Sequence, residues 1–196
     1  MTKEIAKEVN EEIKRMIDWI AIQTLTNDQI VKVVEEIHNF KQTIFVTGLG
    51  RSGFVANGFG MRLGHLDYDT RILRETTAPP VKKGDLFIVV SGGGEHEIAQ
   101  TRIAREIGAK VIAVTSQIDS TLARLADIKL IIPGRSKEAS LSSSYKERRM
   151  RGIPIFPLGT AFEVFAMIVL DAIISHLAVI KKKTEEDLQK RHAKPQ

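Results

Sequence analysis

The sequence of 196 residues contains no cysteine, which excludes disulfide bonds and thiolate metal sites. A chain without cysteine is typical of a reducing compartment. The first sixteen residues are charged throughout and have no apolar core of a secretion signal, so we expect a cytoplasmic protein. The longest apolar run, 164–180, is interrupted by Asp171 and His176, and it predicts a buried helix rather than a membrane span.

Positive charge is in modest excess, with a formal net charge of +5. The excess is concentrated in a Ser-rich segment, 134–152, and in three lysines at 181–183. No zinc-finger or RNA-binding motif accompanies these segments, so we do not expect a nucleic-acid partner. We interpret the charge as a solvated basic surface or a field that attracts small phosphorylated substrates. We expect the segment 134–152 to be a mobile loop.

Hydrophobic residues make up 43% of the chain, which suits a single domain, 41–196, preceded by a helical segment, 1–40. In that segment the spacing of apolar residues predicts two helices. Their expected apolar stripes are Ile5, Ile13, Ile17 and Ile20 with Trp19 beside them, and then Ile30, Val33, Val34 and Ile37.

After Phe40 the pattern changes to short β-branched runs that alternate with helical patterns. The runs predict strands at 44–48, 71–73, 86–92, 110–116 and 128–133. Helices are predicted at 54–66, 97–108, 120–127 and about 160–180. Continuous apolar strands that alternate with helices indicate an α/β fold with a parallel sheet covered by helices on both faces.

Ligands of such sheets bind beyond the carboxyl ends of the strands, so the three strand-to-helix junctions GLGRS, SGGGEH and TSQIDS are the candidate binding site. Glycines uncover backbone N–H groups there, and hydroxyls can share the oxygens of one phosphate. The alternative is that the glycines form tight turns and the hydroxyls only cap helices. The candidate binding residues are Gly50, Arg51, Ser52, Ser91, Gly92, Gly93, Gly94, His96, Thr115 and Ser116.

From Ile44 onward the chain resembles the 6-phospho-3-hexuloisomerases of the SIS (sugar isomerase) superfamily. The resemblance rests on GLGRSGFVANGFGMRLGHL, RETTAPPVKKGDL, VVSGGGEHE, IAVTSQIDSTLARLAD, IPGR, PLGTAFEVFAMIVLDAII and KRHA, all in the family's order. It implies a flavodoxin-like sheet of five parallel strands, a homotetramer with active sites near subunit boundaries, and no metal or other cofactor. It also implies interconversion of a 3-hexulose 6-phosphate and fructose 6-phosphate, a step of the ribulose monophosphate pathway.

The glycine-rich junction departs from the family pattern Ser-Gly-Ser-Gly-x-Thr, because Gly93 and His96 stand at the second serine and the threonine. Two hydroxyl donors are therefore missing. His96 lies near a helix start, where its ring N–H can replace one of them. The identity of the bound anion is accordingly left open by the sequence.

Proton transfer in such an isomerase requires a carboxylate or an imidazole. Glu163 matches the proposed base of the family, although Thr160 to Glu163 also has the form of a capping box. His192 matches the family's terminal Arg-His, and His65 is a further candidate that can instead cap its helix. We expect His176 to be a packed core residue. Arg51 can neutralise substrate charge or pair with a surface acid.

Two other functions compete with an isomerase. One is a non-catalytic sugar-phosphate sensor, although no helix-turn-helix precedes the sheet. The other is a nucleotide-binding protein, which is disfavoured because GLGRSG lacks the third glycine of the dinucleotide fingerprint and an acidic residue for the ribose.

Overall fold

The computed structural model describes residues 2–24, 28–134, 147, 150 and 160–192. One parallel sheet of five strands in the order β2-β1-β3-β4-β5 forms the centre of the molecule. This α/β arrangement confirms the predicted fold class. The strands are β1 (Ile44–Gly48), β2 (Thr70–Ile72), β3 (Leu86–Val90), β4 (Lys110–Thr115) and β5 (Ile128–Ile131).

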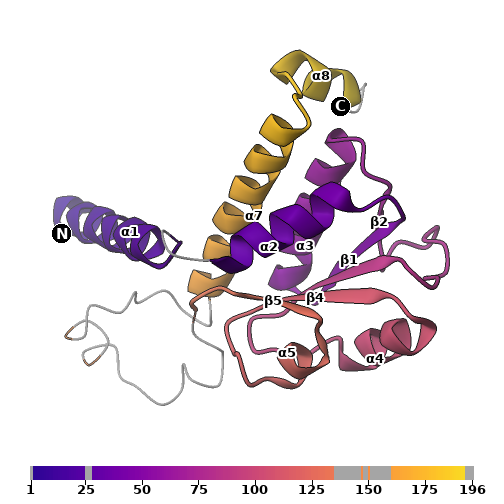
Figure 1. Cartoon of the computed structure of the whole chain (residues 1–196). Helices are drawn as coiled ribbons and strands as arrows, with labels where there is room; N and C mark the ends of the chain where they lie inside the picture. Colours follow the sequence, from indigo (N-terminus) through magenta and orange to yellow (C-terminus); the bar gives the residue numbers. More distant parts are fainter. Residues whose placement is uncertain (1, 25–27, 135–146, 148–149, 151–159, 193–196) are drawn as a thin grey trace.

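Helices cover both faces of the sheet (Figure 1). One face carries α2 (Asp28–Asn39), α3 (Arg51–His65) and α7 (Thr160–Ile180), and the other carries α4 (Ile98–Ile107) and α5 (Thr121–Leu125). Side chains that alternate along each strand point to opposite faces. Val46 and Ile88 therefore belong to the core under α3 and α7, whereas Phe45 and Phe87 belong to the core under α4.

The register of the central strands brings three carboxyl ends to one level. Gly48 at the end of β1 pairs with Val90 at the end of β3, and Val90 pairs with Val114 near the end of β4. Every residue of β1 and β3 is buried, which explains their unbroken apolar sequences. The three candidate junctions consequently begin side by side.

Helix α7 is the only helix in the described part of the chain that is long and apolar enough to cross a membrane. In the structure it packs against α2 and α3. One stripe of it is buried, as expected for a core helix, and comprises Phe162, Phe165, Ala166, Val169, Leu170, Ile173, Ile174 and Leu177. Helix α8 (Glu185–Arg191) follows it at the end of the described chain.

The expected apolar stripes of the first two helices have different outcomes. Val33, Val34 and Ile37 of α2 are buried, as predicted. The predicted helix α1 (Thr2–Thr24) is present, but its apolar stripe is not covered within one chain, because Ile13 and Ile17 are 42% and 54% exposed. Helix α1 extends away from the sheet and contacts α7, so most of its surface has no core to cover (Figure 1). The side chains of Ile5, Trp19 and Ile20 lie outside the described residues, as does most of the segment 134–152.

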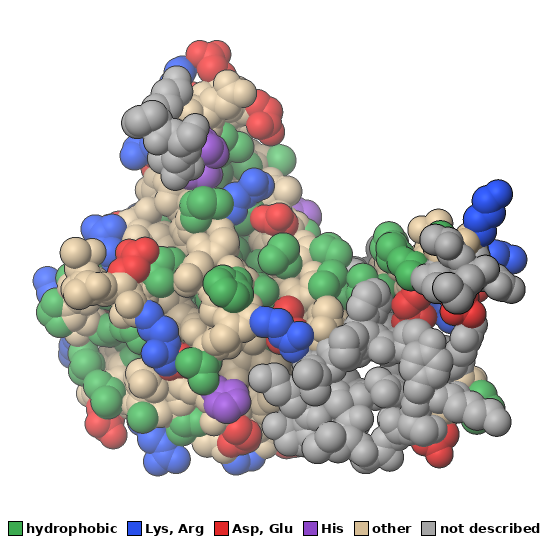
Figure 2. Space-filling view, turned by 180° about the vertical axis from the view of Figure 1, so that it is seen from behind, with side chains coloured by type: hydrophobic (Ala, Val, Ile, Leu, Met, Phe, Trp, Pro, Cys, Tyr) green, Lys and Arg blue, Asp and Glu red, His purple; other side chains and the backbone are tan. Residues whose placement is uncertain are grey.

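Hydrophobic side chains also lie on the surface of the main body, spread between charged groups (Figure 2). The most exposed of those on α3 and α7 are Phe54, Met61, Met167 and Val179, at 74%, 56%, 53% and 76%. Single exposed apolar residues are ordinary, but several on two neighbouring helices are typical of an interaction surface.

Candidate functional site

The glycine-rich loop after β3 is held in shape by its neighbour after β4. The backbone N–H of Ser91 donates to Val114 O at 2.9 Å, and the N–H of Gly94 donates back to Ser91 O at 3.1 Å. The hydroxyls of Thr115 and Ser116 both donate to Gly92 O, at 3.2 and 2.7 Å. These two predicted binding hydroxyls thus order the loop.

At two of the three consecutive glycines, neighbouring atoms of the protein leave no room for a side chain. A Cβ on Gly92 would lie 2.8 Å from the ring of Phe162. Gly94 has a φ of +69°, and a Cβ there would lie 2.1 Å from Ser120 Oγ. The sequence suggested that a ligand approaches this backbone closely, but for Gly92 and Gly94 the close neighbours are Phe162 and Ser120. Gly93 is half-buried and His96 is exposed.

Ser91 carries a buried hydroxyl that has no partner among the described residues. Its residue is 3% exposed, and among the described residues its Oγ makes no hydrogen bond. Thr47 Oγ1, in the adjacent strand β1, is likewise buried without a partner in the described structure. Buried hydroxyls without a hydrogen bond cost about 1–3 kcal/mol each, so such groups are commonly satisfied by a ligand or by water.

The junction after β1 brings Arg51 to the start of α7. Gly50 has a φ of 58° and precedes α3, in which Arg51 and the buried Ser52 are the first residues. Arg51 Nη1 donates to Thr160 Oγ1 at 3.1 Å, and Arg51 Nε lies 3.4 Å from Glu163 Oε1. The side chain of Glu163 is only 16% exposed. The structure therefore brings the predicted base next to the predicted binding junctions, with Arg51 as its ion-pair partner.

The two histidine candidates lie together but far from Glu163. The rings of His65 and His192 are 5.7 Å apart between centroids. His65 ends α3, 14 residues after Arg51, which corresponds to about 21 Å along a helix. Burial, His192 and Arg62 lower the pKa of His65, in that order of importance. Within one chain, therefore, neither imidazole reaches the carboxylate of Glu163.

The prediction that His176 is a core residue was wrong. His176 is exposed, and its Nδ1 lies 2.8 Å from Ala172 O, one turn earlier in α7. The apolar residues around it in the sequence suggested burial. However, α7 buries only one of its faces, and His176 lies on the other.

Sequence reasoning missed two acidic residues of the glycine loop. Glu95 accepts a hydrogen bond from the backbone N–H of Thr121 at 2.8 Å, and this bond is the main cause of the lowered pKa of Glu95. Glu97 pairs with Arg74, which follows β2, at 2.6 Å. The motif SGGGEHE shows both carboxylates, but only the folded chain shows that each has a partner in another element.

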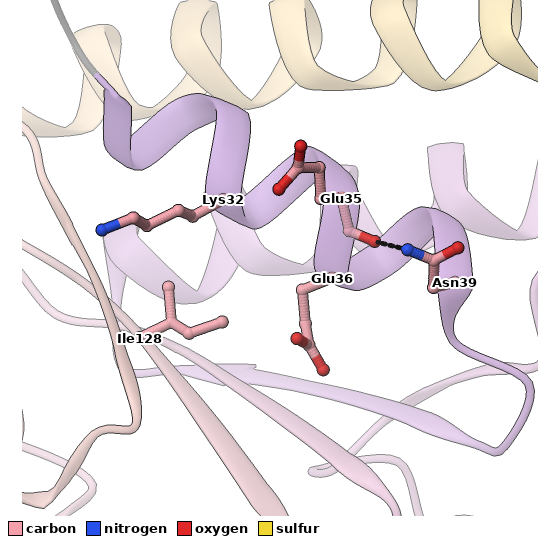
Figure 3. Close-up of a pocket in the computed structure, with 5 residues that line it drawn as sticks. All are labelled: Lys32, Glu35, Glu36, Asn39 and Ile128. Atoms are coloured by element: carbon pink, nitrogen blue, oxygen red, sulfur yellow. Dashed lines mark hydrogen bonds between the residues drawn. The ribbon is translucent and has the colours of Figure 1, made fainter.

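A hollow of about 330 Å³ lies elsewhere, between α2 and the start of β5. Lys32, Glu35, Glu36, Asn39 and Ile128 line it (Figure 3). Ile128 is the first residue of β5, so the hollow is at the amino end of the sheet. With two carboxylates against one lysine, it does not suit a phosphorylated ligand. The described residues contain no group of three or more His, Asp or Glu side chains able to hold a metal ion.

The fold and the carboxyl edge of its sheet together define a doubly wound α/β protein whose strand ends carry glycines, hydroxyls and an Arg–Glu pair. The SIS domain model matches residues 36–147, and the chain belongs to the SIS domain family.

Individual relatives cover nearly the whole chain. A protein of Archaeoglobus fulgidus is 36% identical over 187 residues, 94% of each chain. The 3-hexulose-6-phosphate isomerase of Bacillus subtilis is 31% identical over 194 residues, 98% of this chain and 97% of its own. A crystal structure from Methanococcus jannaschii, for which a 3-hexulose-6-phosphate isomerase function has been inferred, matches with a TM-score of 0.76. It is 26% identical and covers 97% of this chain and 99% of its own.

Proposed function

We propose that this protein is a sugar-phosphate isomerase that interconverts D-arabino-hex-3-ulose 6-phosphate and fructose 6-phosphate in the ribulose monophosphate pathway. The observation that carries the proposal is the Arg51–Glu163 pair beside the loop of Ser91. A shielded carboxylate suits the proton transfer of such a reaction, and a buried hydroxyl without a partner among the described residues suits the phosphate. The name of the Bacillus subtilis relative supports the same substrate.

The reaction requires one proton to move between neighbouring carbons. The carboxylate of Glu163 removes the proton from C2 of the 3-hexulose, and the electron pair forms an enediol. The resulting carboxylic acid returns the proton to C3, while His192 or His65 of another copy accepts the proton of O2 and donates a proton to O3. The guanidinium of Arg51, 3.4 Å from the carboxylate, stabilises the negative charge that develops on the enediol oxygens.

The phosphate is assigned to the loops after β1, β3 and β4. Ser91 Oγ donates to it, and the hydroxyls of Thr115 and Ser116 hold the loop that surrounds it. Removal of Ser91 Oγ by Ser91→Ala leaves no buried group unpaired, so the unfolding midpoint should not fall. Binding of fructose 6-phosphate should weaken about tenfold, the effect of one charge-assisted hydrogen bond.

The direct test is an NMR experiment with purified protein and fructose 6-phosphate in D₂O. The proposed proton transfer exchanges the hydrogen at C3 for deuterium and produces the 3-hexulose 6-phosphate. Unphosphorylated fructose serves as the control and should show no exchange. A protein that neither exchanges this hydrogen nor forms the 3-hexulose would refute the proposed reaction.

A homotetramer in which each active site takes residues from two subunits is part of the proposal. Within one chain, His65 and His192 lie at the far end of α3 from Glu163, so they can serve only the site of another copy. The exposed apolar residues of α1, α3 and α7 offer surface for such contacts. Sedimentation should show a tetramer, and co-refolded Glu163→Gln and His192→Ala chains should recover activity that neither has alone.

A non-catalytic sugar-phosphate sensor is the second candidate. The separation of both histidines from Glu163 in a single chain favours it, because a sensor needs no second proton-transfer group. Binding of fructose 6-phosphate with neither exchange at C3 nor formation of the 3-hexulose 6-phosphate would select this function over the isomerase.

A further inference from the structure

The ion pair between Arg74 and Glu97 stands out at the rim of the glycine loop. Arg74 donates from both Nε and Nη2 to Glu97 Oε1, at 3.0 and 2.6 Å. The side chain of Glu97 is 1% exposed, whereas that of Arg74 is 52% exposed. Among the described residues, Glu97 Oε2 is buried without a hydrogen-bond partner. A buried carboxylate thus holds an accessible guanidinium in one orientation.

The pair lies at the carboxyl edge of the sheet and spans the end of β1. The N–H of Leu73, next to Arg74, donates to Val46 O of β1. Glu97 directly precedes α4 and follows Gly94 by three residues. In the strand order, β1 lies between β2 and β3. Arg74 therefore reaches from the far side of β1 to the loop that carries Ser91.

Glu97 has an unfavourable backbone conformation, with a φ of 63° in the left-handed region. Such a conformation costs a non-glycine residue about 1–3 kcal/mol, and glycine or asparagine would be the better choice. Two hydrogen bonds to its carbonyl, from Thr101 N and Thr101 Oγ1 at 3.0 and 2.6 Å, fix the position. A glutamate at a position whose backbone favours glycine indicates that its carboxylate makes an interaction that offsets this cost.

The charge of the glycine loop itself does not favour a phosphate, so a nearby cation would assist binding. The sequence SGGGEHE contains two glutamates and no lysine or arginine. The hydroxyls of Thr115 and Ser116 are directed to Gly92 O. A sugar phosphate near Ser91 would therefore meet the carboxylates of Glu95 and Glu97, and Arg74 offsets the charge of Glu97.

We propose that Arg74 is a phosphate-binding residue and that Glu97 is the positioning residue that presents it to the glycine loop. A guanidinium has five N–H donors, of which two are used by Glu97. The other donors form a planar fork suited to two phosphate oxygens. This inference rests on the proposed function for its ligand class, and it adds a residue from the β2 end to the three junctions.

The competing explanation is that Arg74 only neutralises the buried Glu97. Arg74→Gln alone does not separate the two, because it leaves a buried carboxylate without a cation and destabilises the loop. The double variant Arg74→Gln/Glu97→Gln removes both charges and keeps the net charge of the loop. Under either explanation its unfolding midpoint should be higher than that of Arg74→Gln. Only phosphate binding by Arg74 predicts that the double variant still binds poorly.

Calorimetric titration with fructose 6-phosphate and with inorganic phosphate provides the test. Arg74→Gln and the double variant should both bind at least about tenfold more weakly than wild type. The matched control is Arg71→Gln, since Arg71 pairs with Asp69 on the exposed side of β2, and its binding should be unchanged. A double variant that binds as tightly as wild type would overturn the proposal.

The two probes also separate this inference from the proposed function. Wild type could bind inorganic phosphate but neither bind nor isomerise fructose 6-phosphate. In that case the proposed function fails, and the titrations of the variants with inorganic phosphate still decide the role of Arg74. If wild type binds neither probe, the role of Arg74 is refuted as well. If the sugar phosphate is isomerised normally by Arg74→Gln with an unchanged KM, only the inference about Arg74 fails.

Discussion

Replacement of Glu163 by glutamine separates the chemistry of this carboxylate from its structural role. Glu163→Gln keeps the size and shape of the side chain and can still accept a hydrogen bond in the first turn of α7. It removes the negative charge opposite Arg51, whose Nε lies 3.4 Å from Glu163 Oε1. An amide cannot take up the C2 proton of the sugar. The change therefore acts on proton transfer much more than on the fold.

The expected size of each effect follows from the contacts. The side chain of Arg51 is 43% exposed, so solvent screens the ion pair, and its loss should lower stability by about 1 kcal/mol or less. Loss of a general base should lower kcat by about 10²-fold or more. Binding of fructose 6-phosphate, which we propose to involve the loops after β1, β3 and β4, should be retained.

Three measurements on the same preparation check this prediction. Thermal unfolding gives the stability, calorimetric titration gives the affinity for fructose 6-phosphate, and deuterium exchange at C3 gives the proton transfer. A Glu163→Gln protein that still exchanges this hydrogen at the wild-type rate would refute the role of Glu163. His192 or His65 would then be the candidate general base. An inactive variant that has also lost binding would show that Glu163 holds the site together.

Three further predictions concern the glycines, His65 and Asp67. Gly94→Ala should lower the unfolding free energy by more than about 2 kcal/mol, because its Cβ would clash with Ser120 at a positive φ. Gly50→Ala, also at positive φ but with nothing within 4 Å, should cost only about 1 kcal/mol; equal losses in chemical denaturation would contradict this. Because the pKa of His65 is lowered, its unfolded form binds more protons below about pH 6.5, so stability should fall as the pH drops below that value. His65→Gln should flatten this part of the pH–stability profile, and an unchanged slope would argue against it. Asp67 accepts bonds from Lys183 and Arg191, and the Lys183 bond is the main cause of its lowered pKa. Asp67→Asn should therefore speed amide exchange in α8 while exchange in β3 stays the same.

The elements of this protein could be predicted because their signals are local. A run of buried β-branched residues gives the same strand in any α/β context, so β1 was predicted at its observed bounds, 44–48. The alternation of strands with helices then requires parallel strands with the junctions at one edge. For the same reason, the sequence placed Arg51, Ser91 and Thr115 at neighbouring strand ends. The exposure of the apolar stripe on α1 and the wrong prediction for His176 have one cause: periodicity shows which residues share a face, but not whether another element covers that face.

The pairings that define the candidate site were decided by tertiary structure. Arg51 meets Glu163 because α3 packs against α7, and Arg74 meets Glu97 across the end of β1, which lies between β2 and β3. No local pattern encodes those distances. Likewise, the triple glycine could be read from the sequence as a close approach, but its neighbours Phe162 and Ser120 come from α7 and the start of α5. Local propensity and hydrophobic periodicity act over a few residues and are visible in the sequence. Contacts between distant residues depend on how whole helices pack on the sheet, and that is determined by the complete set of core interactions.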